Sequence, residues 1–101
     1  MTNPEIGKSV NVGGIATNYI EAGDAANPPL VLIHGSGPGV TAFANWRGVI
    51  PDFAQNFHCF APDTLGFGYT DFPADIQGFN MDRWIAHLVG FLDALGIAKA
   101  H

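Results

Sequence analysis

The run His34-Gly35-Ser36-Gly37-Pro38-Gly39 directly follows an apolar stretch, Leu30 to Ile33. A short continuous apolar run of this kind is typical of a buried strand. Glycine in the following loop allows positive φ angles and lets backbone N–H groups approach a ligand closely. Open α/β sheets bind their ligands at the carboxyl ends of their strands, so this loop is the first place to expect a functional site.

Strands and helices are predicted to alternate along the chain. Gly13-Gly14 is typical of a hairpin turn, Pro51 should interrupt a helix or start a new turn, and Asn80 and Gly96 are typical of a helix start and stop. In chain order, the predicted elements are strands at 9–12, 15–21 and 30–33, a helical stretch at 41–57, a strand at 58–61, a loop at 64–79 and a helix at 80–95. The last residues, 98–101, lead toward a further strand. This pattern predicts an α/β fold with a β-hairpin followed by a parallel β-α-β-α unit.

Apolar residues at helical spacing predict which faces pack. In the first helical stretch they are Trp46, Val49, Ile50, Phe53 and Phe57. In the second they are Trp84, Ile85, Leu88, Val89, Leu92 and Leu95. We expect both stripes to face the sheet.

Length and composition bound the function. Residues 1–101 form at most one domain, shorter than the roughly 200–250 residues common for α/β domains. The net charge is −5 and the four basic residues are scattered, which argues against a nucleic-acid partner. No leader and no apolar run near the ~20 residues of a membrane span are visible, so we expect a cytoplasmic protein that does not enter a membrane.

The glycine loop permits three interpretations. In the first it forms half of an oxyanion hole, with the N–H of Ser36, and of Gly37 as a second candidate, donating to a carbonyl oxygen that becomes negative in acyl transfer. In the second it is a dinucleotide-binding fingerprint, because residues 37–42 match G-x-G-x-x-A and Asp63 ends the next strand. In the third its glycines only satisfy turn geometry. We rank these interpretations hydrolase, turn, nucleotide site, because Pro38 lacks the N–H that a pyrophosphate would need.

No nucleophile is visible in the chain. A nucleophile elbow reads G-x-S-x-G, and neither Ser9 nor Ser36 has that context. Cys59 lies in an apolar strand, where a free cysteine behaves as a small core residue. His34 therefore has no nucleophile in this chain on which it could act as a base.

Two blocks resemble a known family. Residues 34–47 and 61–71 are similar to signature segments of the meta-cleavage product hydrolases, α/β hydrolases that split a carbon–carbon bond in aromatic catabolism, and most similar to the 2-hydroxymuconate-semialdehyde hydrolases among them. Leu92 to Ile97 resembles the helix end before the nucleophile elbow. The resemblance therefore implies the N-terminal part of an α/β-hydrolase core domain, residues 1–101, that stops before the elbow and lacks the lid.

The resemblance also implies a chemistry. The substrate would be a small molecule, a 2-hydroxy-6-oxo-dienoate, hydrolysed by a Ser-His-Asp triad without a metal or organic cofactor, in an enzyme that forms homo-oligomers. Ser36 would line the oxyanion site, Gly35 would adjoin the substrate, Asn45 would hydrogen-bond its carboxylate, and Trp46 would pack near it. By the same resemblance, His34 would support the loop and would not act as the base. Because the triad is missing, we expect residues 1–101 alone to be inactive.

Other titratable residues have simpler explanations. Asp63 and Asp71 bracket a glycine-rich turn, and aspartate commonly fixes such turns by bonding the backbone. His58, His87 and His101 lack the spacing of a metal site. The alternatives that stay open are a nucleotide-binding half-domain of an NAD-dependent oxidoreductase, an ester or epoxide hydrolase, and a stand-alone interaction module.

Overall fold

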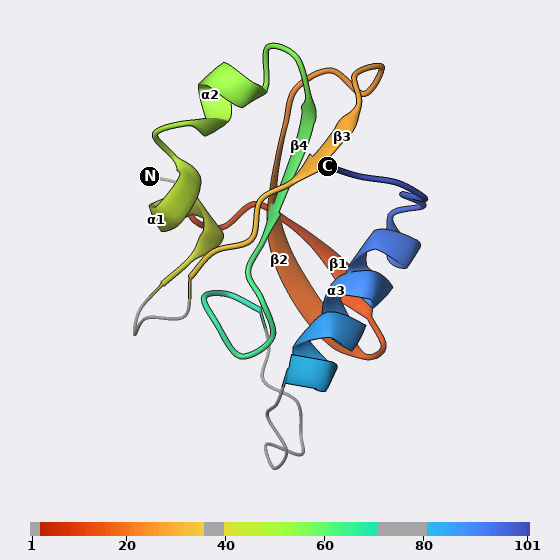
Figure 1. Ribbon diagram of the computed structural model, residues 1–101. Helices are drawn as coiled ribbons and strands as arrows, with labels where there is room; N and C mark the ends of the chain where they lie inside the picture. The colour runs from red at the N-terminus through yellow and green to blue at the C-terminus, as the bar shows by residue number, and fades with distance from the viewer. Residues whose placement is uncertain (1–2, 36–39, 71–80) are drawn as a thin grey trace.

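The computed structural model describes residues 3–35, 40–70 and 81–101 (Figure 1). These residues form a four-stranded mixed sheet in the order β1-β2-β4-β3. The strands are β1 (Lys8–Val12), β2 (Ile15–Ala22), β3 (Pro29–Val31) and β4 (His58–Pro62). β2 pairs antiparallel with β1 and β4, while β3 and β4 are parallel. The predicted fold class, a hairpin followed by a parallel unit, is confirmed.

The hairpin between β1 and β2 turns at two glycines, as predicted. Gly13 and Gly14 have φ angles of 57° and 90°, values that side chains with a Cβ rarely adopt. Val12 and Ile15 close the register on either side of the turn. The glycine pair therefore fixes which residues of the hairpin face each side of the sheet.

β3 lies at one edge of the described sheet and is shorter than predicted. The strand ends at Val31, although the N–H of Leu32 still donates to the carbonyl of Phe60 at 2.9 Å. Its residues are half-buried. On the open side, the backbone of this strand pairs with His101 among the described residues. That residue donates to the carbonyl of Pro29 at 3.0 Å and accepts from the N–H of Val31 at 2.9 Å. The expected approach to a further strand is thus present as this backbone pairing.

The helical stretch predicted at 41–57 is two short helices. The side chain of Thr41 caps α1 (Ala42–Trp46) by accepting from the N–H of Ala44 at 3.0 Å. Pro51 lies in the first turn of α2 (Ile50–Phe53), as its missing N–H allows. Because the chain turns between the helices, the predicted stripe is broken: Ile50 is buried, whereas Val49 and Phe53 are 38% and 37% exposed.

α3 (Met81–Ala94) is followed by Gly96 at a φ of 73°, which confirms the predicted stop. The predicted cap Asn80 lies outside the described residues. The predicted packing stripe is partly wrong, because Ile85 and Val89 are about half exposed at 52% and 50%. Phe91, which the stripe omitted, is fully buried and meets the ring of Tyr19 edge-on at 5.2 Å. The contact between Phe91 and Tyr19 determines which face of α3 packs on the sheet. Helical periodicity in the sequence alone predicted a neighbouring face as the buried one.

The helices cover opposite faces of the sheet, with α3 on one side and α1 and α2 on the other (Figure 1). Each face has its own core. Under α3 the buried residues are Val12, Tyr19, Phe60 and Phe91. Under α1 and α2 they are Leu32, Ala42, Ile50 and Ala61. Since Phe60 and Ala61 are adjacent, β4 supplies both cores by the alternation of a strand. Within the described ranges, no helix has the length and apolar character needed to cross a bilayer.

A histidine is enclosed between α3 and the hairpin. His87 is buried, and its Nε2 lies 2.9 Å from the hydroxyl oxygen of Thr17. Burial lowers the pKa of His87 below its ordinary value of 6.5, because the charged imidazolium loses its hydration. The folded chain therefore favours the neutral ring.

We expect this histidine to make the fold less stable in weak acid. Between its ordinary pKa of 6.5 and its lower value in the folded chain, the unfolded state binds more protons, so the free energy of unfolding falls as the pH is lowered through that window. His87→Gln keeps an N–H group near Thr17 but cannot titrate. Urea unfolding of both proteins between about pH 7.5 and about pH 5 should give the variant the shallower pH dependence.

The titration of Glu21 affects stability at a lower pH than that of His87, so the two contributions can be told apart. A hydrogen bond from Lys8 is the main cause that lowers the pKa of Glu21 from its ordinary 4.5, so its contribution to stability is lost only below that pH. Equal slopes for wild type and His87→Gln above that pH would contradict the prediction.

Candidate functional site

The described residues form a pocket where β3 and β4 end. Its volume is about 240 Å³. The lining residues are Ile33, His34, Gly35, Thr64, Phe67, Met81 and Trp84. They come from the segments after β3 and β4 and from the start of α3. The pocket therefore lies at the carboxyl ends of two parallel strands, where an α/β sheet is expected to bind a ligand.

His34 is a structural acceptor in this pocket. Its Nε2 lies 2.9 Å from the backbone N–H of Thr64, which can only donate. Nε2 must therefore be unprotonated, and the neutral ring carries its proton on Nδ1, which donates to the carbonyl of Gly35 at 2.5 Å. The ring is buried, and Phe67 meets it edge-on at 5.4 Å. This geometry agrees with the expected supporting role, because both nitrogens are already used.

Asn45 holds the first residue of the glycine loop. Its side-chain oxygen accepts from the N–H of Gly35 at 2.7 Å, so the amide must be oriented with Oδ1 toward the backbone. The Nδ2 group then remains as a donor on the exposed side chain. The expected substrate contact of Asn45 would have to use this group, since its oxygen is occupied.

The central residues of the loop fall outside the description. Ser36 and Gly37, the expected oxyanion donors, belong to the segment 36–39, which the structure does not describe. Trp46 packs against the core under α1, and its buried indole N–H has no hydrogen-bond partner among the described residues. That donor is a polar group that the described part of the chain leaves unpaired.

The opposite wall of the pocket is aromatic. Phe67 and Trp84 pack with ring centroids 6.4 Å apart, and the indole N–H of Trp84 donates to the carbonyl of Leu65 at 3.0 Å. This bond joins the start of α3 to the turn after β4. Phe67, from the turn after β4, and Trp84, from α3, both line the pocket.

Asp63 directly follows β4 and is almost completely buried, at 1% exposure. Its carboxylate accepts from the N–H of Ala42 at 2.8 Å, from the N–H of Tyr69 at 2.9 Å and from the side-chain amide of Asn18 at 3.0 Å. The predicted bond to the turn backbone is confirmed at Tyr69, and the bonds to Ala42 and Asn18 were not foreseen. A carboxylate enclosed in this way has no access to a ribose, which removes the acid that the dinucleotide interpretation needs.

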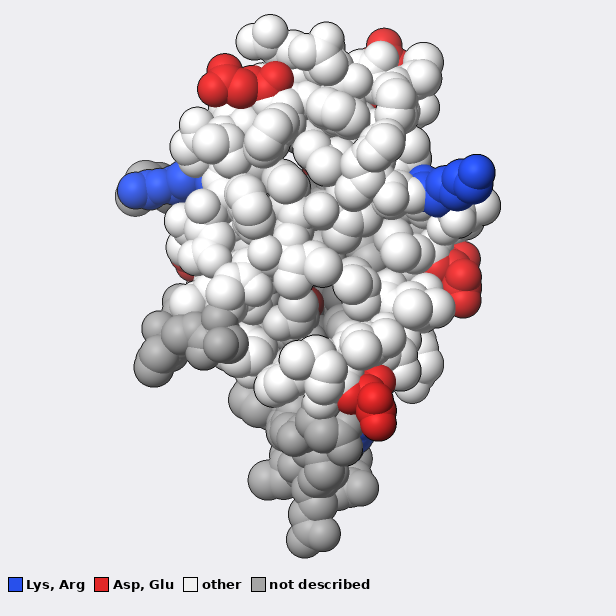
Figure 2. Space-filling view, in the orientation of Figure 1, with Lys and Arg blue, Asp and Glu red and all other residues white. Residues whose placement is uncertain are grey.

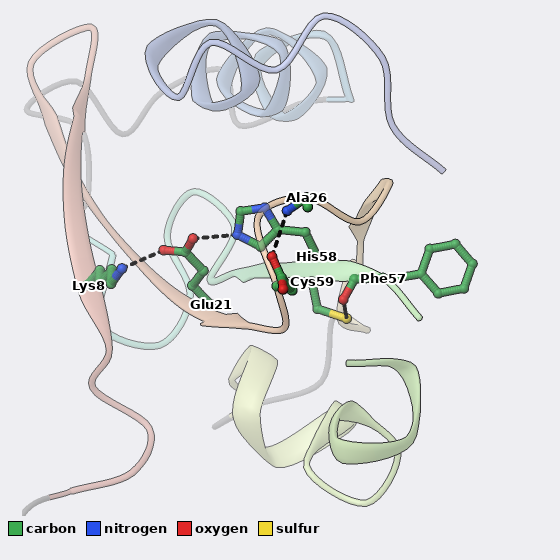
Figure 3. A network of polar contacts seen from close by, with 7 residues as sticks. Lys8, Glu21, Ala26, Phe57, His58 and Cys59 are labelled. Carbon is green, nitrogen blue, oxygen red and sulfur yellow. Dashed lines mark hydrogen bonds and ion pairs between the residues drawn. The ribbon is translucent and has the colours of Figure 1, made fainter. Parts of the chain in front are cut away.

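A second polar cluster lies at the other end of the sheet and is unsuited to catalysis. Figure 3 shows the carboxylate of Glu21 between Lys8 and His58, at 2.6 and 2.5 Å. His58 begins β4, whereas the pocket follows its end. Beside it, Cys59 directs its sulfur to the carbonyl of Phe57, and burial raises the pKa of its thiol. A protonated, enclosed thiol is no nucleophile, in agreement with its interpretation as a core residue.

In the face shown in Figure 2, the basic side chains stand apart at the margins and do not gather into a patch. Among the residues that the structure describes, no three His, Cys, Asp or Glu side chains gather as a metal site. The pocket at the strand ends is thus the site with the most specific geometry.

Comparison with known proteins identifies the fold family. The model of the alpha/beta hydrolase fold matches residues 28–101, which is most of the chain. The chain belongs to the α/β-hydrolase fold family. The pocket at the ends of β3 and β4 therefore belongs to an α/β-hydrolase fold. The alternative of a nucleotide-binding half-domain of an oxidoreductase is not supported.

The chain is similar to several individual hydrolases. The chain is 54% identical over 98 residues to 2-hydroxymuconate semialdehyde hydrolase from Pseudomonas sp. strain CF600, covering 97% of this chain and 34% of that protein. It is 52% identical over 97 residues to a 2-hydroxy-6-oxo-2,4-heptadienoate hydrolase of Pseudomonas putida, covering 96% and 34%. A crystal structure of a variant of the meta-cleavage product hydrolase CumD superposes with a TM-score of 0.91 at 48% identity, covering 98% of this chain and 35% of that one. The chain thus spans about a third of the length of these relatives.

Proposed function

We propose that residues 1–101 are the N-terminal part of the core domain of a carbon–carbon bond hydrolase that acts on 2-hydroxy-6-oxo-dienoates in aromatic degradation. The observation that carries this proposal is the 54% identity to a 2-hydroxymuconate semialdehyde hydrolase over nearly the whole chain. The pocket after β3 and β4, with its apolar and aromatic lining, is consistent with a small planar substrate.

In this proposal the reaction proceeds by hydrolysis through an oxyanion. The dienol substrate is first ketonised by proton transfer, and water then adds to the 6-oxo carbon. The bond between C5 and C6 breaks, leaving a 2-hydroxypentadienoate and a carboxylic acid. The N–H groups of Ser36 and Gly37 would donate to the oxygen at C6 when it carries negative charge, at roughly 3 kcal/mol per donor. The triad would come from chain beyond these residues, and the reaction requires no cofactor.

The described neighbours of the loop support this assignment. His34 and Asn45 hold the two sides of Gly35 through its carbonyl and its N–H. The two peptide units that flank Gly35 are thus both held at the point where the chain enters the loop, and preorganised donors are the effective ones. Gly35 and the free Nδ2 of Asn45 would then contact the substrate, with Trp46 packing nearby.

A second candidate within the fold is epoxide hydrolysis. The chain is 35% identical over 92 residues to epoxide hydrolase A of Mycobacterium tuberculosis. This is a weaker match than those to the dienoate hydrolases, so we place it second. The remaining parts of the proposal are that the whole enzyme works in the cytoplasm, forms homo-oligomers, and takes a small-molecule substrate.

A chimera tests the proposed activity. We expect residues 1–101, joined to the remaining two-thirds of the CF600 2-hydroxymuconate semialdehyde hydrolase, to hydrolyse that enzyme's dienoate substrate, because the segment supplies a matching oxyanion loop and pocket wall. Loss of the dienol's absorbance measures turnover, with the intact CF600 enzyme as the control. A folded chimera that leaves the dienoate unchanged, or opens an epoxide instead, would contradict the proposal.

Asn45→Asp in the same chimera tests the carboxylate contact. The aspartate keeps an oxygen to accept from Gly35 but replaces the Nδ2 donor with negative charge. We expect KM for the dienoate to rise about 10-fold or more, since a hydrogen bond to a charged group contributes about 1.5–3 kcal/mol, and kcat to change less. Asn56→Asp adds the same charge at an exposed position after α2 and should leave KM unchanged. Equal KM values for the two variants would rule out the contact.

A further inference from the structure

We infer that Asp63 is a positioning residue that fixes both walls of the pocket at once. This inference rests on the proposed function, because it assigns the carboxylate a role in the geometry of that reaction. Asp63 touches neither the pocket nor a substrate. It acts through the two backbone segments whose N–H groups it accepts.

The first segment is the start of α1. The N–H of Ala42, the first residue of that helix, donates to Oδ1 of Asp63 at 2.8 Å. A first-turn N–H has no partner within its own helix, so this bond supplies one and sets where the helix begins. Asn45 of the same helix accepts from the N–H of Gly35 at 2.7 Å, and Gly35 lines the pocket. The position of α1 therefore bears on the pocket wall at Gly35.

The second segment is the turn after β4. The N–H of Tyr69 donates to Oδ2 of Asp63 at 2.9 Å, and the hydroxyl of Thr70 donates to its carbonyl at 2.7 Å. These bonds close the turn that presents Phe67 to the pocket and to His34. One buried side chain thus links the helix that contacts Gly35 to the turn that carries Phe67.

Asn18 in β2 contacts the carboxylate from the neighbouring strand. Its amide donates to Oδ2 of Asp63 at 3.0 Å and to the carbonyl of Glu5 at 2.8 Å, while its oxygen accepts from the N–H of Gly7 at 2.9 Å. Asn18 is also buried, with 5% exposure. Because all of these groups are paired, the carboxylate has little freedom to follow a displaced loop.

An asparagine cannot replace this carboxylate. Asp63 accepts from three N–H donors, and both of its oxygens are used. The single oxygen of an amide can face Ala42 or Tyr69, and its NH₂ group then opposes the other donor. Asp63→Asn should therefore release one wall while the other remains held.

Gly68 offers an independent way to displace the same group. A Cβ added there would lie 2.3 Å from Oδ2 of Asp63, too close for the carboxylate to keep its position. Gly13 is a matched control, because its φ of 57° is close to the 55° of Gly68 and a Cβ there meets nothing within 4 Å. The pair separates contact with Asp63 from backbone strain.

The test uses the chimera and its Asp63→Asn, Gly68→Ala and Gly13→Ala variants. We expect Asp63→Asn and Gly68→Ala to lower kcat for the dienoate by up to about 10²-fold, the effect of a small misplacement of reacting groups, with KM changed much less. Hydrogen exchange by mass spectrometry should show faster exchange in residues 40–46 or 64–70 for both variants, and unchanged exchange in β1, residues 8–12. Gly13→Ala should keep kcat and both exchange patterns.

The outcomes distinguish this inference from the proposed function. Unchanged exchange in both segments for Asp63→Asn would overturn the positioning role whether or not the parent chimera is active. An active parent whose Asp63→Asn variant keeps full kcat per folded molecule would also overturn it. An inactive parent with faster exchange in the variants would reject the proposed function and leave the positioning of the two segments supported.

Discussion

A single buried carboxylate, that of Asp63, links the parts of this molecule that lie far apart in sequence. It sits where β4 ends and accepts from β2, from the start of α1 and from the turn before residue 70. A buried charge of this kind is tolerated only when its oxygens are fully hydrogen-bonded. Because the carboxylate needs these hydrogen bonds, each N–H donor is also held at hydrogen-bonding distance from it. The sheet, one helix and one loop are therefore placed relative to one another by the same group.

Residues of catalytic type perform structural tasks around the pocket. His34 accepts from Thr64 and donates to Gly35, so the tautomer that a base would need is already committed to the backbone. Asn45 accepts from the other side of Gly35. As a result, both peptide units that flank Gly35 are held at the start of the glycine loop. In an α/β hydrolase, such a fixed entry is what allows loop N–H groups to be preorganised for an oxyanion.

Local sequence was enough to predict the turns and the order of elements. Gly13-Gly14, Pro51 and Gly96 each require a particular backbone, and each lies where that backbone occurs. The rotation of α3 was not predictable in this way, because the ring of Tyr19 on another strand selects Phe91 as the buried residue. The break between α1 and α2 likewise depends on how each helix meets the sheet. Periodicity describes one element at a time, whereas these choices are made by contacts between elements.

In the candidate site, too, some features could be predicted from the sequence and others depend on contacts between elements. The glycine loop could be anticipated from its place directly after an apolar strand, and the supporting role of His34 from the resemblance to the hydrolase family. The second and third partners of Asp63 could not, since Ala42 and Asn18 lie 21 and 45 residues away in sequence. Only the folded structure shows that Asp63 accepts hydrogen bonds both from its own turn and from the first N–H of α1.

Scalar couplings across hydrogen bonds test this central role most directly. In uniformly ¹⁵N,¹³C-labelled protein, we predict measurable couplings from the amide nitrogens of both Ala42 and Tyr69 to the side-chain carboxyl carbon of Asp63. The backbone bond from the N–H of Asp63 to the carbonyl of Asn18, at 2.9 Å, provides an internal reference. Detection of the reference coupling together with absence of both carboxylate couplings would contradict the account.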